Sequence, residues 1–426
     1  MVEGSLWKNI FLFSVPLMFS QLLEVMFNLS DVAVVGKFAD YKALGAVGST
    51  TLLVSLFVGF LIGMGSGVNV QVALGLGARD KRNVEQTIHT SLILCFIVGM
   101  AACILCFVLA RPVLTLMKTK EDLLEQAVLY LRIYALGLPG MAVYNFGNGV
   151  MSAGGDTRHP LVYLSIAGIL NVLLNLFFVI VMHLAAAGVA IASVIAQYVS
   201  AALIIANLLR REDECNLSVK KIRLHKDAAK SVLLIGLPTG IQNAIFAIAN
   251  LFVQMGVNSF DTVIFNILNA CYTACASFIG QNRGAGNKER MKKSYFISLF
   301  YGAGVAALAG GVLLLSGRQF LSLFANNAEV IDAGMQRLRI MGFSFVMAPF
   351  MDCTIAASRG LGKSVVPTII VVMGSCVFRV IWIYTVFAYF HTIPSLYLLY
   401  IFSWTITAVA EGIYFCIVYK KTVRKM

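Results

Sequence analysis

Long apolar stretches separated by short polar segments dominate the sequence. A helix that crosses about 30 Å of hydrocarbon needs roughly 20 consecutive apolar residues, and it satisfies its backbone hydrogen bonds internally. About twelve stretches of this kind occur along the chain. They cover residues 8–36, 44–74, 88–110, 126–150, 160–182, 184–209, 229–258, 263–281, 294–317, 334–358, 366–391 and 394–420. The pattern therefore predicts an all-α membrane protein with about twelve transmembrane helices.

The composition supports a location in the lipid bilayer. Of the 426 residues 59% are hydrophobic and only 12% are charged, which leaves too few polar side chains to cover a soluble globular surface. The first apolar stretch is too long for the core of a signal peptide, and it contains Glu24 and Asp31. No small-residue cleavage pattern follows it, so we expect it to remain in the protein as a helix.

The net charge of +13 is concentrated in alternate loops. Lys and Arg cluster at residues 79–82, 210–230, 283–293 and 420–425. The positive-inside rule places these segments, and with them both termini, in the cytoplasm. Basic residues that follow membrane segments in this way indicate topology, so we do not expect a nucleic-acid partner.

The second half of the chain repeats motifs of the first half. The repeats share an offset of 207 positions, and they are Leu131-Arg132-Ile133 with Leu338-Arg339-Ile340, Gly77-Ala78 with Gly284-Ala285, and Gly155 and Pro160 with Gly362 and Pro367. Membrane transporters are commonly built from two related bundles. We therefore predict an N-lobe over residues 1–209, a basic cytoplasmic linker over 210–228 and a C-lobe over 229–426.

The repeat also predicts a shortened helix in the second half. Pro16 and Pro238 are 222 positions apart, so the second half lacks fifteen residues between this point and Gly284. The apolar residues that remain, roughly 263–280, would form about 27 Å of helix, which is close to the minimum for crossing a bilayer.

Several motifs resemble those of the multidrug and toxic compound extrusion (MATE) family, in particular its NorM-like bacterial branch, over essentially the whole chain. They are Asn28-Leu29-Ser30-Asp31, Gly155-Asp156-Thr157-Arg158-His159-Pro160, Gly280-Gln281-Asn282 and Arg359-Gly360-Leu361-Gly362. The resemblance implies two six-helix lobes around a V-shaped cleft in the bacterial inner membrane. It also implies a monomer that exports organic, often cationic small molecules in exchange for Na⁺ or H⁺, without a further cofactor.

Three polar residues of the first apolar stretch share one helix face. Glu24, Asn28 and Asp31 follow an i, i+4, i+7 spacing. A charge in the middle of a membrane costs about 3 kcal/mol on insertion scales, so acids at such depth are candidates for function. We expect this face to line the cleft, with Glu24 and Asn28 as candidates for substrate contact and Asp31 as a candidate for binding Na⁺ or a proton.

The resemblance implies the partners of Asp31 in an N-lobe cation site. The matching positions are Asn171, Asn175 and Ser193. Sodium-binding members of the family usually carry aspartate at the position of Asn175, and neutral oxygens hold a hard cation less strongly. Sodium and proton coupling therefore both remain open, as does an interpretation in which Asp31 only pairs with a polar neighbour.

The second half offers fewer candidates. Asp352 lies 207 positions after Asn145, so the repeat predicts equivalent cleft-facing positions for them and a role in cation or substrate contact. Pro16 and Pro238 each remove a backbone hydrogen bond from a helix, and we expect them to help gate the cleft. Arg379 and Glu411 are predicted to pair inside the C-lobe.

The sequence contains no signature of an enzyme. It has no GxxxxGK[ST] nucleotide-binding motif, no HExxH motif and no convergent set of His, Asp or Cys residues. The alternatives to an antiporter are a flippase for lipid-linked oligosaccharides from the same superfamily and an inactive exporter, and the fifteen-residue shortfall favours the latter.

Overall fold

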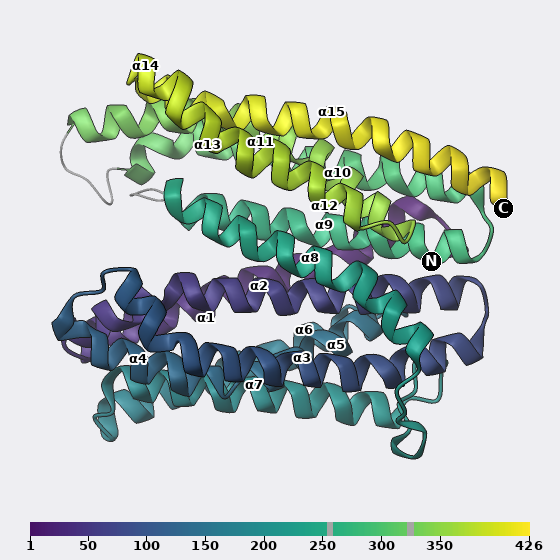
Figure 1. Cartoon of the computed structure of the whole chain (residues 1–426), viewed down its shortest axis with the longest axis horizontal. Coiled ribbons are helices and arrows are strands. Elements are labelled where there is room, and N and C mark those ends of the chain that lie inside the picture. Colours follow the sequence, from purple (N-terminus) through teal and green to yellow (C-terminus); the bar gives the residue numbers. More distant parts are fainter. Residues whose placement is uncertain (254–258, 322–327) are drawn as a thin grey trace. The chain divides into compact units, whose positions relative to one another are not determined.

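The computed structural model describes residues 1–253, 259–321 and 328–426, and within these ranges it is helical without a strand (Figure 1). The helices up to residue 210 are α1 (Leu6–Phe38), α2 (Tyr41–Gly77), α3 (Lys81–Leu116), α4 (Glu121–Ala135), α5 (Leu138–Ala153), α6 (Arg158–Leu176), the π-helical η1 (Phe177–Val181) and α7 (Ala185–Arg210). The later ones are η2 (Val219–Lys221), α8 (Lys226–Val253), α9 (Ser259–Gly284), α10 (Lys288–Leu321), α11 (Ala328–Gly360), α12 (Val365–Val371), η3 (Val372–Val377), α13 (Phe378–Trp382), η4 (Ile383–Phe387), α14 (Ala388–Phe390) and α15 (Ile393–Lys425).

The helices have the length and hydrophobicity of membrane spans. In the part of the chain that the structure describes, eight helices could cross a bilayer, and two bent helix pairs raise the number to ten. The predicted all-α membrane protein is therefore confirmed, while the count of twelve spans stays a prediction.

Short polar residues start several of these helices. The Asp40 carboxylate accepts a hydrogen bond of 2.9 Å from the Ala43 N–H at the start of α2, and Asp80 caps α3 in the same way. Thr392 and Ser395 form a reciprocal capping box at the start of α15. Such caps satisfy backbone N–H groups that have no partner within the helix.

The repeat recognised in the sequence recurs in the backbone. The helices α4 and α5 form one bent span with an angle of 43°, and the segments 334–342 and 344–360 of α11 form another with an angle of 42°. The two breaks lie at positions that the 207-residue offset relates. Gly155 and Gly362, which the offset also relates, both have a positive φ, 91° and 68°, which glycine adopts without strain.

The helix that contains the predicted eighth apolar stretch, 263–281, extends beyond it at both ends. The helix α9 begins at Ser259 and contains 26 residues, which corresponds to about 39 Å at 1.5 Å per residue. It is nevertheless eleven residues shorter than its counterpart α2, which contains 37. This helix is not among the eight that pass the length and hydrophobicity criteria in the described residues, so the short apolar span at 263–280 stays a prediction.

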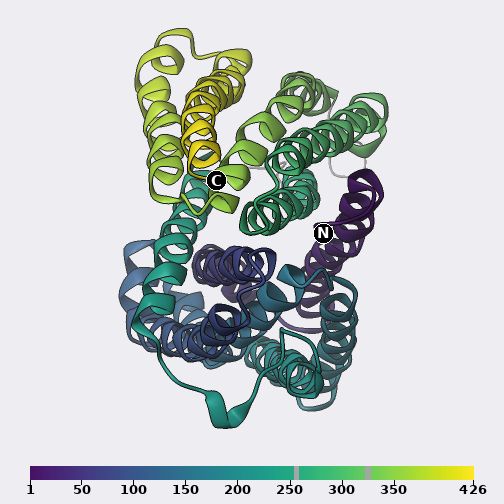
Figure 2. The ribbon, with the colours of Figure 1, turned by 90° about the vertical axis from the view of Figure 1, so that its right-hand side faces the viewer.

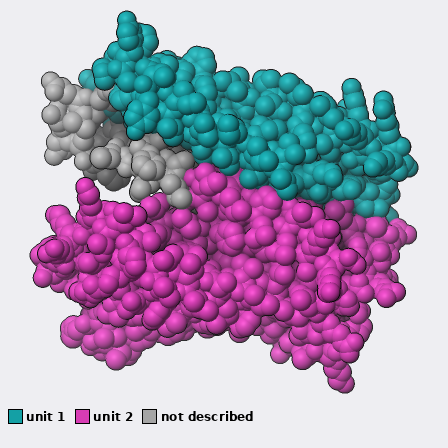
Figure 3. Space-filling model, in the orientation of Figure 1, with its two compact units in different colours: residues 1–15, 252–426 teal, residues 16–251 magenta. Residues whose placement is uncertain are grey.

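The helices group into two compact units, coloured separately in Figure 3. We call residues 16–251 the N-terminal unit, and residues 1–15 with 252–426 the C-terminal unit. Figure 2 shows many of their helices nearly end-on. The boundaries fall inside α1, at Pro16, and inside α8, after Leu251. The lobes drawn from the sequence repeat, which divide at residues 210–228, stay a prediction.

Glycine allows two helices of the N-terminal unit to cross closely. A Cβ atom added to Gly63 of α2 would lie 2.3 Å from the backbone nitrogen of Gly240 in α8, and one on Gly67 would lie 2.6 Å from that of Gly236. Membrane helices associate through such small residues because their backbones can then come into contact. Pro238 of α8 lies between Gly236 and Gly240.

Candidate cation-binding site

Asp31 lies at the centre of a buried polar cluster in the N-terminal unit. Its Oδ1 accepts hydrogen bonds from the Nδ2 atoms of Asn171, at 2.9 Å, and Asn175, at 2.5 Å. Its Oδ2 accepts a longer bond, 3.5 Å, from the Ser193 hydroxyl. All four residues are buried. The structure therefore brings together the four residues that the sequence singled out for a cation site.

Three helices supply these four side chains. Asn171 and Asn175 are four residues apart and so project from one face of α6, while Asp31 comes from α1 and Ser193 from α7. The contact between α1 and α6 depends on Gly168, one turn before Asn171. A Cβ atom on Gly168 would lie only 1.8 Å from the Phe27 ring, which itself is one turn before Asp31.

The amide groups of Asn171 and Asn175 contact Asp31 only through their nitrogen atoms. The side-chain oxygens Oδ1 of Asn171 and Asn175 are buried and have no hydrogen-bond partner among the described residues. A buried acceptor is normally paired, so each of these oxygens could accept a further hydrogen bond or bind a cation. By rotating, the amides would present two neutral oxygens beside the carboxylate and hydroxyl, a set of hard ligands that suits Na⁺.

Sequence reasoning missed several polar neighbours of the cluster. Tyr130 and Tyr134 of α4 are buried, stack with ring centroids 6.1 Å apart and lie within electrostatic range of Asp31. Gln197, one turn after Ser193 on α7, interacts with Tyr134, and its buried Oε1 has no hydrogen-bond partner in the part of the chain that the structure describes. The four-residue spacing from Ser193 to Gln197 was the signal available in the sequence.

Glu24 and Asn28 have different surroundings from Asp31. Glu24 is partly buried and within electrostatic range of Tyr134 and Tyr144, whereas Asn28 is exposed. The three residues therefore differ in burial and in neighbours, although they share one helix face. Their predicted roles in substrate contact stay predictions.

The related positions Asn145 and Asp352 are both partly buried. In the N-terminal unit, the Asn145 side chain donates a hydrogen bond of 3.0 Å to the Met141 carbonyl. In the C-terminal unit, Asp352 lies on α11 near Tyr272 and interacts electrostatically with Arg359. Asp352 thus lies near charged side chains, whereas Asn145 forms a hydrogen bond within its own helix.

The predicted pair of Arg379 and Glu411 is wrong. The Arg379 guanidinium donates from Nε to the Ser403 hydroxyl at 3.3 Å and lies 4.5 Å from the centre of the Tyr400 ring. The charge that acts most strongly on Glu411 is Arg359. Ser403 precedes Glu411 by eight residues on α15, so Arg379 lies about 12 Å along the helix from the acid.

The motif Gly155–Pro160 and the start of the linker are joined by polar side chains. Asp156, in the motif before α6, accepts a hydrogen bond of 3.0 Å from Arg211 and another from His159. Arg211 also holds Asp213, and these hydrogen bonds lower the pKa of the Asp213 carboxyl. The motif therefore ties the start of α6 to the end of α7.

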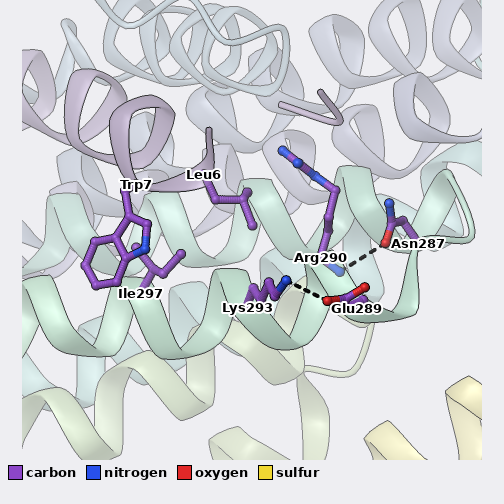
Figure 4. A pocket seen from close by; sticks show the side chains of 7 residues that line it. All are labelled: Leu6, Trp7, Asn287, Glu289, Arg290, Lys293 and Ile297. Carbon is purple, nitrogen blue, oxygen red and sulfur yellow. Dashed lines mark hydrogen bonds and ion pairs between the residues drawn. The ribbon is translucent and has the colours of Figure 1, made fainter. Parts of the chain in front are cut away.

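A surface pocket of about 460 Å³ lies in the C-terminal unit (Figure 4). It is lined by Leu6, Trp7, Asn287, Glu289, Arg290, Lys293 and Ile297. The Arg290 guanidinium donates to the carbonyls of Met1 and Gly4, both at 3.0 Å. The arginine thus fastens the N-terminal segment to α10, and the pocket includes none of the residues predicted for the site.

No group of three or more His, Cys, Asp or Glu side chains that could hold a metal ion occurs in the described ranges. A cation at Asp31 would therefore depend on one carboxylate and neutral oxygens. Such a site is weaker than one built from several carboxylates, which suits an ion that must bind and leave.

Apolar helices that enclose a buried, hydrogen-bonded carboxylate such as Asp31 are typical of membrane transporters. The MatE family model matches residues 16–177 and 251–385, which is more than half of the chain. The chain belongs to this family of multidrug and toxic compound extrusion transporters, and it is a transporter rather than an enzyme.

The relatives agree with this assignment. The probable multidrug resistance protein YoeA of Bacillus subtilis is 24% identical over 393 residues, 86% of this chain and 84% of the relative. The probable multidrug resistance protein NorM of Thermotoga maritima is 23% identical, over 85% of this chain and 82% of the relative. An outward-facing multidrug resistance MATE transporter has the same fold, with a TM-score of 0.91, 21% identity and coverage of 100% and 98%.

Proposed function

We propose that this protein is a secondary antiporter of the bacterial inner membrane that exports organic, often cationic compounds in exchange for Na⁺ or H⁺. The observation that carries the proposal is Asp31, a buried carboxylate of α1 that accepts hydrogen bonds from side chains of two other helices, α6 and α7. An acid at this depth is costly unless it is paired, so it is suited to bind and release a small cation.

Exchange requires that the driving ion and the substrate exclude each other. A proton or Na⁺ at Asp31 neutralises the carboxylate, and a departing ion leaves a negative charge that favours an organic cation nearby. The hydrogen bonds from α6 and α7 would change with ion binding, and the ion could thereby shift the equilibrium between two helix arrangements. The basic loops support cytoplasmic termini.

Efflux of a fluorescent cationic dye from proteoliposomes tests the proposal. A Na⁺ gradient or a proton gradient should drive efflux by the wild type, and Asp31→Asn should abolish it. Asp227→Asn, at an exposed position at the start of α8, is the matched control and should transport normally. Unchanged efflux by a well-folded Asp31→Asn protein would remove Asp31 from the mechanism.

A second substitution distinguishes the two ions. Asn175→Asp adds a carboxylate beside Asp31, which strengthens binding of a hard cation. If Na⁺ is the coupling ion, the variant should reach half-maximal efflux at a lower Na⁺ concentration. If the proton is the coupling ion, efflux should stay independent of Na⁺ in both proteins.

Export of an anionic metabolite is the second candidate function. A relative from Shewanella oneidensis, 22% identical over 75% of this chain, is a FAD transporter. FAD therefore belongs in the same assay as a competing substrate. Absence of dye and FAD efflux under both gradients would favour a lipid-linked oligosaccharide flippase or an inactive exporter.

A further inference from the structure

The C-terminal unit contains a buried acid without a hydrogen-bond donor. Glu411 of α15 is 0% exposed, and neither of its carboxylate oxygens has a hydrogen-bond partner in the part of the chain that the structure describes. An ionised carboxylate in an apolar interior normally accepts several hydrogen bonds, because losing its hydration without them is very costly. This environment therefore favours a bound proton.

Glu411 ends a column of polar residues on the buried face of α15. Ser403, Thr407 and Glu411 are spaced four residues apart, and all three are 0% exposed. The Thr407 hydroxyl lies 3.4 Å from the hydroxyl of Ser375 on η3, and Ser403 accepts from Arg379. Ser403 and Thr407 thus have hydrogen-bond partners, whereas no described residue donates a hydrogen bond to Glu411.

The charges around Glu411 come mainly from α11. Arg359 is the strongest of them, and Asp352 opposes it. Asp352 and Arg359 are seven residues apart on α11, which places them on one face, and α11 packs against α15 (Figure 1). Arg379 also acts on Asp352, while the tyrosines near the two acids are Tyr272 and Tyr414.

The cluster contains two acids within electrostatic range of one guanidinium. Arg359 interacts with both Asp352 and Glu411, so each acid is better stabilised in its ionised form when the other is neutral. Asp352 is partly exposed and Glu411 is not. The nearby positive charge of Arg359 disfavours Na⁺, which needs several hard ligands, and leaves the proton as the ion that fits.

We propose that Glu411 is a second proton-binding site of the transporter, coupled to Asp352 through Arg359. With Asp352 ionised, its negative charge offsets that of Arg359, and Glu411 keeps its proton. An organic cation that neutralises Asp352 leaves Arg359 to stabilise the Glu411 carboxylate. The O–H bond then breaks, the electron pair stays on the oxygen and the proton passes to water.

This proposal rests on the proposed function, since it adds a proton to the exchange cycle. Infrared difference spectroscopy of the full-length transporter in nanodiscs tests it without requiring transport. The wild type should show a band of a buried protonated carboxyl that disappears at high pH. Glu411→Gln should lack the band, Glu411→Asp should show it at a shifted frequency, and Glu212→Gln, at an exposed position of the linker, should leave it unchanged.

A cationic dye provides the second arm of the experiment. It should remove the Glu411 band in the wild type and in Asp31→Asn, because the two sites lie in different units. A spectrum of Glu411→Gln identical to that of the wild type, a band that ignores pH and dye, or one that responds to Na⁺ instead would overturn the proposal. If no dye is transported, the antiporter assignment fails, whereas the pH-dependent band still decides whether Glu411 binds a proton.

Discussion

Gly168 sets the distance between the helix that carries Asp31 and the helix that carries its two asparagines. A methyl group at this position would lie 1.8 Å from Cε2 and 2.0 Å from Cζ of Phe27. Carbon atoms in normal contact are about 3.5 Å apart, so the ring or its helix must move by about 1.7 Å. Overpacking of this kind costs about 1–3 kcal/mol.

We predict that Gly168→Ala folds but transports poorly. Moving α1 away from α6 by that distance stretches the 2.9 Å bond between Asn171 and Asp31 beyond the limit of a hydrogen bond. A hydrogen bond to a charged group is worth about 1.5–3 kcal/mol. This loss alters ion binding at Asp31, and the initial rate of dye efflux from proteoliposomes should therefore fall by about tenfold or more.

Two further variants make this prediction decisive. Phe27→Leu removes the outer part of the ring, so the double variant Gly168→Ala with Phe27→Leu should recover much of the lost efflux. Gly48→Ala, at a glycine of α2 with open space around it, should behave as the wild type does. Normal efflux by Gly168→Ala, or no recovery in the double variant, would refute the idea that this contact positions Asp31.

Three other predictions concern packing and the linker. Gly63→Ala places a methyl group against the Gly240 backbone, which cannot rotate away, so the melting temperature should fall clearly, and no fall would contradict the tight crossing. Arg211→Gln should lower the free energy of unfolding, because it removes the hydrogen bonds that lower the Asp213 pKa in the folded protein. This stabilisation is complete above the unfolded Asp213 pKa of about 3.9 and is lost as the pH falls through the lower folded pKa. The wild type should therefore resist urea better than the variant at neutral pH, and the difference should vanish in acid. Burial raises the pKa of the Cys215 thiol to about 12, so a maleimide should label it only slowly at pH 7 in mass spectrometry, and rapid labelling would mean that the linker opens.

The membrane fold was predictable because its determinants are local. A run of about 20 apolar residues favours the bilayer whatever the rest of the chain does. The repeat was visible for a related reason, since Gly155 and Gly362 occupy turns with positive φ that few other residues tolerate. The start of α9 at Ser259 was missed, because polar residues such as Asp261 and Thr262 continue the helix beyond its apolar part.

The candidate site was predictable in part. Asp31 stood out because an acid within an apolar stretch is rare, and the resemblance to a family supplied Asn171, Asn175 and Ser193. Tyr134 was not identified, because a buried tyrosine in an amphipathic helix has the spacing of any core residue.

The sequence by itself determined that the chain crosses the membrane several times, that its two halves are related and that Asp31 is the leading acid. Only the tertiary structure decided the partners of the other charges, pairing Arg379 with Ser403 and placing Glu411 near Arg359. The physical reason is that hydrophobicity acts along each helix separately. Side-chain partners depend instead on how each helix is rotated and how closely it crosses its neighbours, which contacts between residues distant in the sequence determine.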